Sequence, residues 1–154
     1  MNIVIANRQR TKKINSRLLK QIIAALFEDL KIEGAELGIN VVSAKEMAQV
    51  NWNYLRHEGS TDVITFDYGE NARLARTLAP PDLNGEIFIC VDDAISQAKQ
   101  FKTSWQLEIV RYIVHGVLHL LGHDDVNAKA KRKMKAEENR LLRKLSARFA
   151  LSKL

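Results

Sequence analysis

The residues of this chain best suited to chemistry are two histidines, a glycine and an aspartate that lie close together. His115, His119, Gly122 and Asp125 form the pattern H-x-x-x-H-x-x-G-x-x-D. Histidines four apart on a helix project from the same face, and a glycine just beyond them permits the left-handed turn that ends a helix. The chain can then fold back and bring Asp125 towards both imidazoles. Three protein ligands with one open position are what a catalytic zinc ion needs, so the pattern predicts a metal centre.

The identity of the third ligand depends on two opposing arguments. Imidazole is the better zinc donor, and this favours His123. His123 directly follows Gly122, however, where the chain is still leaving the helix axis, while Asp125 has two more residues in which to turn back. We favour Asp125 on this geometry and keep His123 as the alternative. Zinc accepts two histidines and a carboxylate, although the spacing also suits other divalent transition metals.

The spacing of the motif is that of the metzincin peptidases, with one ligand changed from His to Asp. Those enzymes carry a general-base Glu after the first histidine, where this chain has Gly116. Peptide hydrolysis must protonate a poor amine leaving group. Phosphodiester cleavage instead needs a cation on the phosphate oxygens and a positioned nucleophile. Gly116 therefore argues against a peptidase.

Arg56 is a candidate for holding a phosphate. It lies in the polar segment 53–62, just ahead of a predicted strand. A guanidinium can bind a phosphate through two parallel hydrogen bonds. Taken alone, a loop arginine is more often a surface residue, and so is the neighbouring His57.

The hydrophobic periodicity predicts a single α+β domain with a small sheet. We expect strands at residues 2–6, 36–43, 61–67 and 85–91, and helices at residues 14–31, 45–54, 92–102, 104–121 and about 128–150. Residues 68–84, which include two prolines, should form a mobile surface loop. The helix that carries the histidines is apolar nearly all round and should be the central buried helix.

Composition is that of an ordinary soluble protein. The chain has 154 residues, 46% hydrophobic and 27% charged, which fits one domain spanning residues 1–154. There is no apolar run long enough for a membrane span, and the N-terminus lacks the apolar stretch of a signal peptide. Cys90 is the only cysteine, which excludes an internal disulfide and fits a reducing cytoplasm.

The net charge of +6 is concentrated in the last predicted helix and the residues after it. From residue 127 onwards the chain has ten basic side chains and only two acidic ones, Glu137 and Glu138, so this segment carries +8 and the rest of the chain −2. Such asymmetry is typical of a protein that binds a polyanion. The alternative is a solvated basic face that serves solubility.

Several segments together resemble the YbeY family of bacterial rRNA maturation factors. They are Asn53–Arg56, Ser60–Phe66, Gly85–Cys90 with the following Ala94 and Gln97–Ala98, and His115–Asp125. The resemblance covers nearly the whole chain. It implies a zincin-like α+β domain, with a small mixed sheet and about five helices. The implied activity is that of a zinc-dependent, single-strand-specific endoribonuclease of the cytoplasm. That family acts at the 3′ end of 16S rRNA and in ribosome quality control. The implied partners are therefore single-stranded RNA, the small ribosomal subunit and its assembly proteins, with no membrane.

The same resemblance assigns roles to individual residues. His115 and His119 match the first two zinc ligands of the family, and Arg56 matches an arginine held to be important for activity. The third ligand of the family is usually histidine, and that position here is Asp125. The register thus supports Asp125 over His123, while the change to a carboxylate alters the affinity and preference of the site for metals.

Two other functions compete with RNA cleavage. The first is a metallopeptidase or another metal hydrolase, which the metzincin-like spacing suggests. The second is a ribosome-assembly factor without catalytic activity, in which the metal only stabilises the fold.

Overall fold

The computed structural model describes residues 1–69 and 82–154. Within these ranges it contains four strands and five α-helices, with one π-helical turn and one 3-10 turn. In chain order they are β1 (Asn2–Asn7), α1 (Ser16–Asp29), β2 (Gly34–Val42), α2 (Ala44–Val50), the π-helical turn η1 (Asn51–Leu55), β3 (Val63–Asp67), β4 (Asp82–Cys90), α4 (Val91–Phe101), α5 (Trp105–Leu120), α6 (Ala128–Arg148) and the 3-10 turn η2 (Leu151–Lys153).

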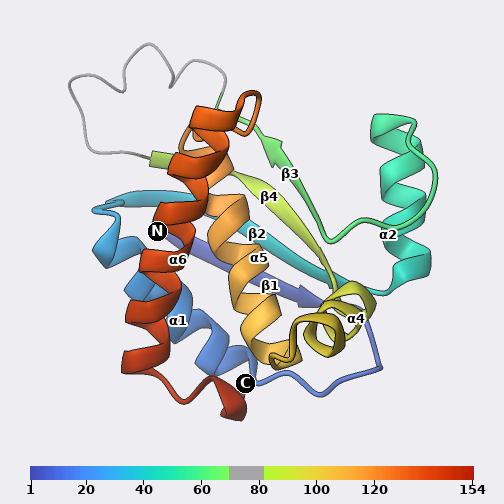
Figure 1. Ribbon diagram of the computed structural model, residues 1–154, viewed down its shortest axis with the longest axis horizontal. Helices are drawn as coiled ribbons and strands as arrows, with labels where there is room; N and C mark the ends of the chain where they lie inside the picture. The colour runs from blue at the N-terminus through green and yellow to red at the C-terminus, as the bar shows by residue number, and fades with distance from the viewer. Residues whose placement is uncertain (70–81) are drawn as a thin grey trace.

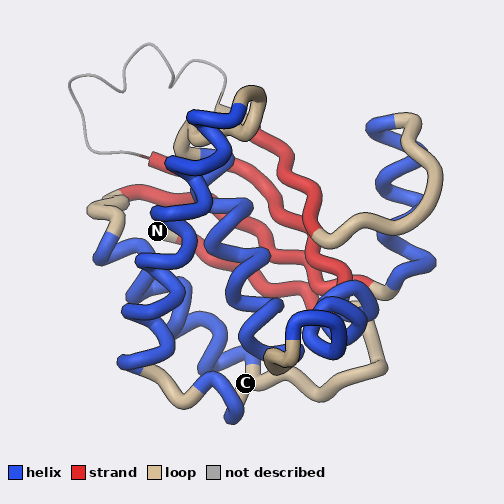
Figure 2. The backbone as a smooth tube through the Cα atoms, in the orientation of Figure 1, coloured by secondary structure: helices blue, strands red, loops and turns tan. Residues whose placement is uncertain are grey.

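The strands form one small mixed sheet in the order β1-β2-β4-β3. β1, β2 and β4 are parallel, and β3 runs antiparallel to β4 at the edge. Because side chains alternate along a strand, Ile39 of β2 and Ile87 and Ile89 of β4 all face the main core, where each is 0% exposed. Figure 1 shows α5 across this face with α6 and α1 beside it, and Figure 2 shows the sheet behind these helices. The predicted α+β class is confirmed.

The opposite face of the sheet has a smaller core under α2. Met47 and Val50 of α2 pack there against Val42, Ile64 and Phe88. These strand residues alternate with those of the main core, as the two-residue period of a strand requires. This smaller core attaches the segment of α2 and η1 to the end of the sheet where β3 begins.

α5 is the central helix, as its sequence predicts. Ser104 caps its first turn by accepting a hydrogen bond from the amide of Leu107 at 3.1 Å. Its end is a Schellman turn, in which Gly122 has φ 99° and the amide of His123 donates to the carbonyl of Leu118 at 3.0 Å. Only glycine adopts this backbone conformation readily. Although α5 is apolar, none of the described helices is both long and apolar enough to cross a bilayer.

Several predicted boundaries were wrong. β3 begins at Val63 and not at residue 61, and α1 spans Ser16–Asp29 and not residues 14–31. β4 begins at Asp82 and not at residue 85, because residues 82–84 pair in parallel with Gly34–Glu36 of β2. β2 likewise begins two residues earlier than predicted. The helix predicted over residues 45–54 is α2 followed by the π-helical turn η1. The rest of the predicted surface loop, residues 70–81, lies outside the described residues.

Candidate functional site

The two histidines of the motif meet on one face of α5. Their Nε2 atoms lie 3.1 Å apart, and their ring centroids are 4.7 Å apart with the ring planes inclined by 78°. A spacing of four residues places the side chains one helical turn apart. The structure thus brings together His115 and His119, and it directs the same nitrogen of each ring towards the other.

The second nitrogen of each ring has a hydrogen-bond partner that determines where the ring proton lies. Nδ1 of His119 lies 3.0 Å from the carbonyl oxygen of His123. A carbonyl oxygen only accepts, so this Nδ1 carries the proton. Nδ1 of His115 lies 2.9 Å from Oε2 of Glu138, and an ionised carboxylate also only accepts. In the neutral rings both Nε2 atoms therefore carry bare lone pairs that face each other.

Glu138 is ionised although it is buried. Its exposed fraction is only 3%, and burial alone would raise its pKa. The hydrogen bond from His115, the charge of Lys135 and the hydrogen bond from Arg111 outweigh burial and lower the pKa of Glu138 to about 2. Lys135 lies 3.3 Å and Arg111 3.1 Å from Oε1. Glu138 thus stays a negative acceptor for His115 at neutral pH.

Burial keeps His119 neutral. Desolvation lowers the pKa of this imidazole first, and the neighbouring His115 lowers it further, while the charge of Asp125 acts in the opposite direction. Two neutral imidazoles whose Nε2 lone pairs lie 3.1 Å apart repel each other unless a cation lies between them. This arrangement fits a metal ion, because histidines that ligate metals usually donate their other nitrogen to a carboxylate or a backbone carbonyl.

The candidates for the third ligand lie near the two histidines, but they are not within ligand distance of a common point with them. Asp125 lines the same pocket as His115. His123 contributes its carbonyl oxygen to His119, and its side chain lines a second pocket with His119 and Asp67. Asp124 accepts a hydrogen bond from the amide of Val126, as a turn residue does. Within residues 1–69 and 82–154, no three His, Cys, Asp or Glu side chains are close enough to form a ligand group.

Gly116 has a packing role that its sequence position did not reveal. A Cβ atom at this position would lie 2.8 Å from Cδ1 and 3.0 Å from Cγ2 of Ile87. The residue is buried where α5 crosses β4. A glutamate here would be directed into the core, so this fold has no room for the peptidase base at that position.

Arg56 is not beside the histidines. It ends η1 in a left-handed conformation with φ 55°, and its guanidinium carbon lies 5.5 Å from the centroid of the Trp52 ring. Its side chain is exposed, as is that of His57. Arg56 lines neither of the two pockets that the histidines border.

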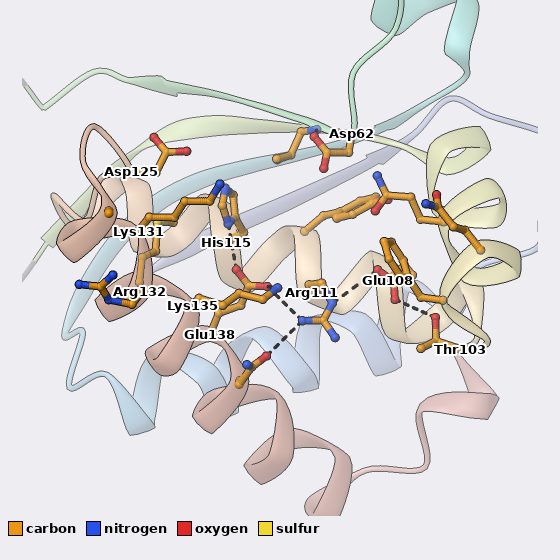
Figure 3. Close-up of a pocket in the computed structure, with 18 residues that line it drawn as sticks. Asp62, Thr103, Glu108, Arg111, His115, Asp125, Lys131, Arg132, Lys135 and Glu138 are labelled. Atoms are coloured by element: carbon orange, nitrogen blue, oxygen red, sulfur yellow. Dashed lines mark hydrogen bonds and ion pairs between the residues drawn. The ribbon is translucent and has the colours of Figure 1, made fainter.

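A pocket of about 890 Å³ opens beside His115 between α4, α5, α6 and the start of β3. Figure 3 shows His115 and Asp125 at one end of this pocket with Lys131 and Arg132 of α6, and Glu108 at the other end. Asp62 lies across from α5. Two of the candidate metal ligands, His115 and Asp125, thus border a space that is large enough for part of a substrate.

Ion pairs divide the basic residues of α6 into two groups. Towards the C-terminus, Arg140 and Lys144 pair with Asp29 of α1, and Arg148 pairs with Glu28. Near the N-terminus, the basic side chains at positions 129 and 131–133 are exposed and have no ion pair among the described residues; these are Lys129, Lys131, Arg132 and Lys133. They lie at the positive end of the helix dipole, where basic residues are unfavourable. Arg143, further along the helix, is also exposed and without an ion pair in the described ranges. Most of the unpaired positive charge of α6 is therefore at its N-terminal end, where Lys131 and Arg132 line the pocket described above.

Glu138 is the site residue that sequence reasoning missed. In the sequence it is one of only two acids in a basic segment. Its spacing was a usable signal, because position 138 shares one helix face with Met134, Leu141 and Leu145, which are all buried. A carboxylate on a buried face requires a partner.

Comparison with known proteins identifies the fold. The solution structure of a protein from Thermotoga maritima superposes with a TM-score of 0.68. The match covers 96% of this chain and 91% of that one, at 23% sequence identity.

Comparison of sequences identifies the family. The sequence model of Endoribonuclease YbeY matches residues 4–146. A protein named Endoribonuclease YbeY from Syntrophotalea carbinolica is 32% identical over 151 residues, which cover 96% of this chain and 97% of the relative. One from Phocaeicola vulgatus is 36% identical over 135 residues, or 88% of each protein. A relative from Myxococcus xanthus, 32% identical over 127 residues, is longer: the match covers 82% of this chain and 42% of that protein. The chain belongs to the Endoribonuclease YbeY family.

Proposed function

We propose that this protein is an endoribonuclease that hydrolyses phosphodiester bonds in single-stranded RNA during maturation of ribosomal RNA. Its family and the name of its relatives support this reaction. The observation that carries the proposal is the pair of bare Nε2 atoms of His115 and His119, beside a pocket with unpaired basic residues. The first feature suits a cation, and the second suits a polyanion.

His115, His119 and Asp125 would hold one zinc ion, or another divalent transition metal, with His123 as the alternative third ligand. Such an ion supplies Lewis acidity and a bound water of low pKa. The donor types fit, because zinc binds imidazole nitrogen and carboxylate oxygen. Glu138 and the carbonyl of His123 hold the two rings in the orientation that leaves Nε2 free.

Other residues would bind the RNA. Lys131, Arg132 and Lys135 line the pocket and attract the phosphates on both sides of the scissile bond. Arg56 would stabilise the charge that develops on the phosphate, and we propose that it meets the RNA only once the strand is bound. In the hydrolysis, the water oxygen bonds to phosphorus, the P–O ester bond breaks and the departing oxygen takes a proton.

We further propose that the substrate is the 3′ end of 16S rRNA, reached on the small ribosomal subunit together with its assembly proteins in the cytoplasm. A role in ribosome quality control follows from the same activity. The basic end of α6 supports docking on structured RNA, and such docking weakens as the salt concentration rises.

The test of this function is cleavage of labelled single-stranded RNA by the purified protein with zinc. We expect cleavage that chelation abolishes and that His115→Ala and Arg56→Ala each remove, while Glu137→Gln retains it. Absence of metal-dependent cleavage would contradict the proposal. Cleavage of casein would favour a peptidase. If the wild type cleaves no RNA, and His119→Ala lowers both the melting temperature and the binding to ribosomes, the result would favour an assembly factor.

The third ligand has its own test. We expect the metal content of the purified protein to fall in Asp125→Ala and to stay near the wild-type value in His123→Ala. The reverse result would assign the third ligand to His123.

A further inference from the structure

The end of the pocket farthest from His115 differs in chemistry from the end near it. Thr103 and Glu108 lie at this end. Gln97, Gln100 and Phe101 of α4 line the same pocket, as does Tyr112 of α5, one helical turn before His115. These are amide, hydroxyl and aromatic groups. The carboxylates of Asp62 and Glu108 also border the pocket, and the guanidinium of Arg111 pairs with Glu108 and Glu138. This end therefore repels a second phosphate and suits a neutral, planar, polar group.

Tyr112 has a buried hydroxyl without a hydrogen-bond partner among the described residues. The residue is only 2% exposed. Buried polar atoms are nearly always paired, and an exception calls for an explanation. Burial first, and then the charge of Asp62, raise the pKa of this hydroxyl. The group thus keeps its proton. The residue lines the pocket, but its hydroxyl is sealed from solvent, so the side chain must turn towards the pocket before it can donate to a bound group.

Phe101 is an exposed aromatic ring in the same pocket. It lies at the end of α4 and is 61% exposed, although it borders a cavity. Aromatic rings that line a groove next to basic residues are typical stacking surfaces for the bases of single-stranded nucleic acid. The neighbouring Gln97 and Gln100 offer donors and acceptors to the edge of such a base.

The pocket also has a suitable length. Glu108, Tyr112 and His115 follow one another along α5 and all line it. With a rise of about 1.5 Å per residue, Glu108 and His115 are roughly 10 Å apart along the helix axis. Figure 3 shows these two residues towards opposite ends of the pocket. A phosphate at the histidines would leave room for one base at the far end.

We propose that this far end is a base subsite, in which the base of a nucleotide next to the scissile phosphate stacks on Phe101. The side chain of Tyr112 turns towards the bound base and donates a hydrogen bond to it. The inference rests on the proposed endoribonuclease function and adds a source of nucleotide preference. Phe101 and Tyr112 act as specificity-determining residues. The metal ligands would supply no such preference, because they would contact the ion and not the base.

The experiment measures binding and cleavage of short single-stranded RNAs. One set varies the base at each position around the cleavage site, and one member carries a single abasic nucleotide there. Phe101→Ala removes the stacking surface, Phe101→Tyr restores it, and Tyr112→Phe removes only the hydroxyl. Val4→Ala is the control, since Val4 is 54% exposed on β1, at the other edge of the sheet from β3. Thermal unfolding of each variant verifies that the fold is kept.

We expect Phe101→Ala to raise KM about 5- to 150-fold with kcat largely kept, which corresponds to one base–aromatic stack. Phe101→Tyr and Val4→Ala should behave as the wild type does. Tyr112→Phe should raise KM about 2- to 10-fold, as expected for one neutral hydrogen bond. It should also flatten the nucleotide preference at one position. The wild type should bind the intact RNA more tightly than the abasic RNA, and Phe101→Ala should bind both equally.

The result that would overturn the subsite is unchanged discrimination against the abasic RNA in Phe101→Ala, with an unchanged nucleotide preference in Tyr112→Phe. If the wild type still cleaves RNA in a manner that depends on His115, the endoribonuclease proposal stands and only the subsite falls. If the wild type cleaves nothing but Phe101→Ala abolishes abasic discrimination in binding, the nuclease proposal falls and the subsite stands.

Discussion

The proton on Nδ1 of His115 determines whether Nε2 of the same ring can bind a metal ion. Glu138 accepts from Nδ1 and so leaves Nε2 as the free donor atom of the ring. The carboxylate performs this role from a buried position, where Arg111 and Lys135 balance its charge. A buried charge without such partners would be strongly destabilising. The orientation of a candidate metal ligand on α5 therefore depends on a residue of α6.

Glu138→Gln tests this dependence. The amide oxygen still accepts from Nδ1, but the negative charge that makes the imidazole a stronger ligand is lost. We expect the affinity for zinc to fall about 10- to 100-fold, as is usual when the outer partner of a ligating histidine is changed. Competition with a chromophoric chelator measures this affinity. Glu137→Gln is the matched control, because Glu137 pairs with Arg140. Equal zinc affinity in the two variants would contradict the role of Glu138.

Sequence reasoning succeeded at single residues where local geometry decides. The spacing of His115 and His119 and the left-handed turn at Gly122 both follow from properties of one helix. The contact of Glu138 with His115 joins residues 23 apart on two helices. It depends on how α5 and α6 pack, which no local pattern states. The close approach of Gly116 to Ile87 is hidden for the same reason.

At the scale of elements, α6 has two different halves. Its C-terminal half is attached to α1 by ion pairs with Glu28 and Asp29. Its N-terminal half presents unpaired bases beside the pocket. The charge count of +8 could not separate the two, because the partners lie on a helix more than a hundred residues earlier. Similarly, Asp82 belongs to β4 because β2 offers it a pairing register, and its local sequence predicted a loop.

The attachment of α6 to α1 should depend on pH. The hydrogen bond from Lys144 lowers the pKa of Asp29, and the charge of Arg140 adds to this effect, while burial opposes it. A carboxyl whose pKa is lower in the folded state stabilises the fold above its unfolded pKa of about 3.9. This contribution disappears as the pH falls through the folded pKa.

We therefore expect Asp29→Asn to lower the free energy of unfolding by about 0.5–1 kcal/mol at neutral pH, in the range of partly exposed ion pairs. The difference from the wild type should shrink as the pH falls below about 4. Urea unfolding at several pH values measures it. Glu33→Gln is the control, because Glu33 is exposed and has no ion pair in the described ranges. A difference that is independent of pH would show that the charge of Asp29 has no role.

At the scale of the whole molecule, positive charge and the pocket coincide. Lys131 and Arg132, which have no ion pair among the described residues, lie at the end of α6 that borders the pocket, beside Asp125 and His115. Net charge alone predicted a polyanion partner without saying where it binds. The fold shows where it would bind, because α6 packs beside α5 and its bases at positions 131 and 132 line the same pocket as His115. RNA binding should therefore depend on a few bases at one end of α6, and the bases at the other end should matter little.

Two double variants with the same loss of charge separate these groups. Lys131→Ala with Arg132→Ala removes bases that line the pocket. Arg148→Ala with Lys153→Ala removes bases from the opposite end of α6 and from η2. Each contact with a phosphate of single-stranded RNA contributes about 0.7 to the slope of log K against log salt concentration. We expect the first pair to reduce this slope by roughly 1.4 and the second pair to leave it near the wild-type value. Fluorescence anisotropy of a labelled RNA over a range of KCl concentrations measures the slope. Equal reductions in the two pairs would mean that RNA responds to the net charge of the protein and not to a surface beside the pocket.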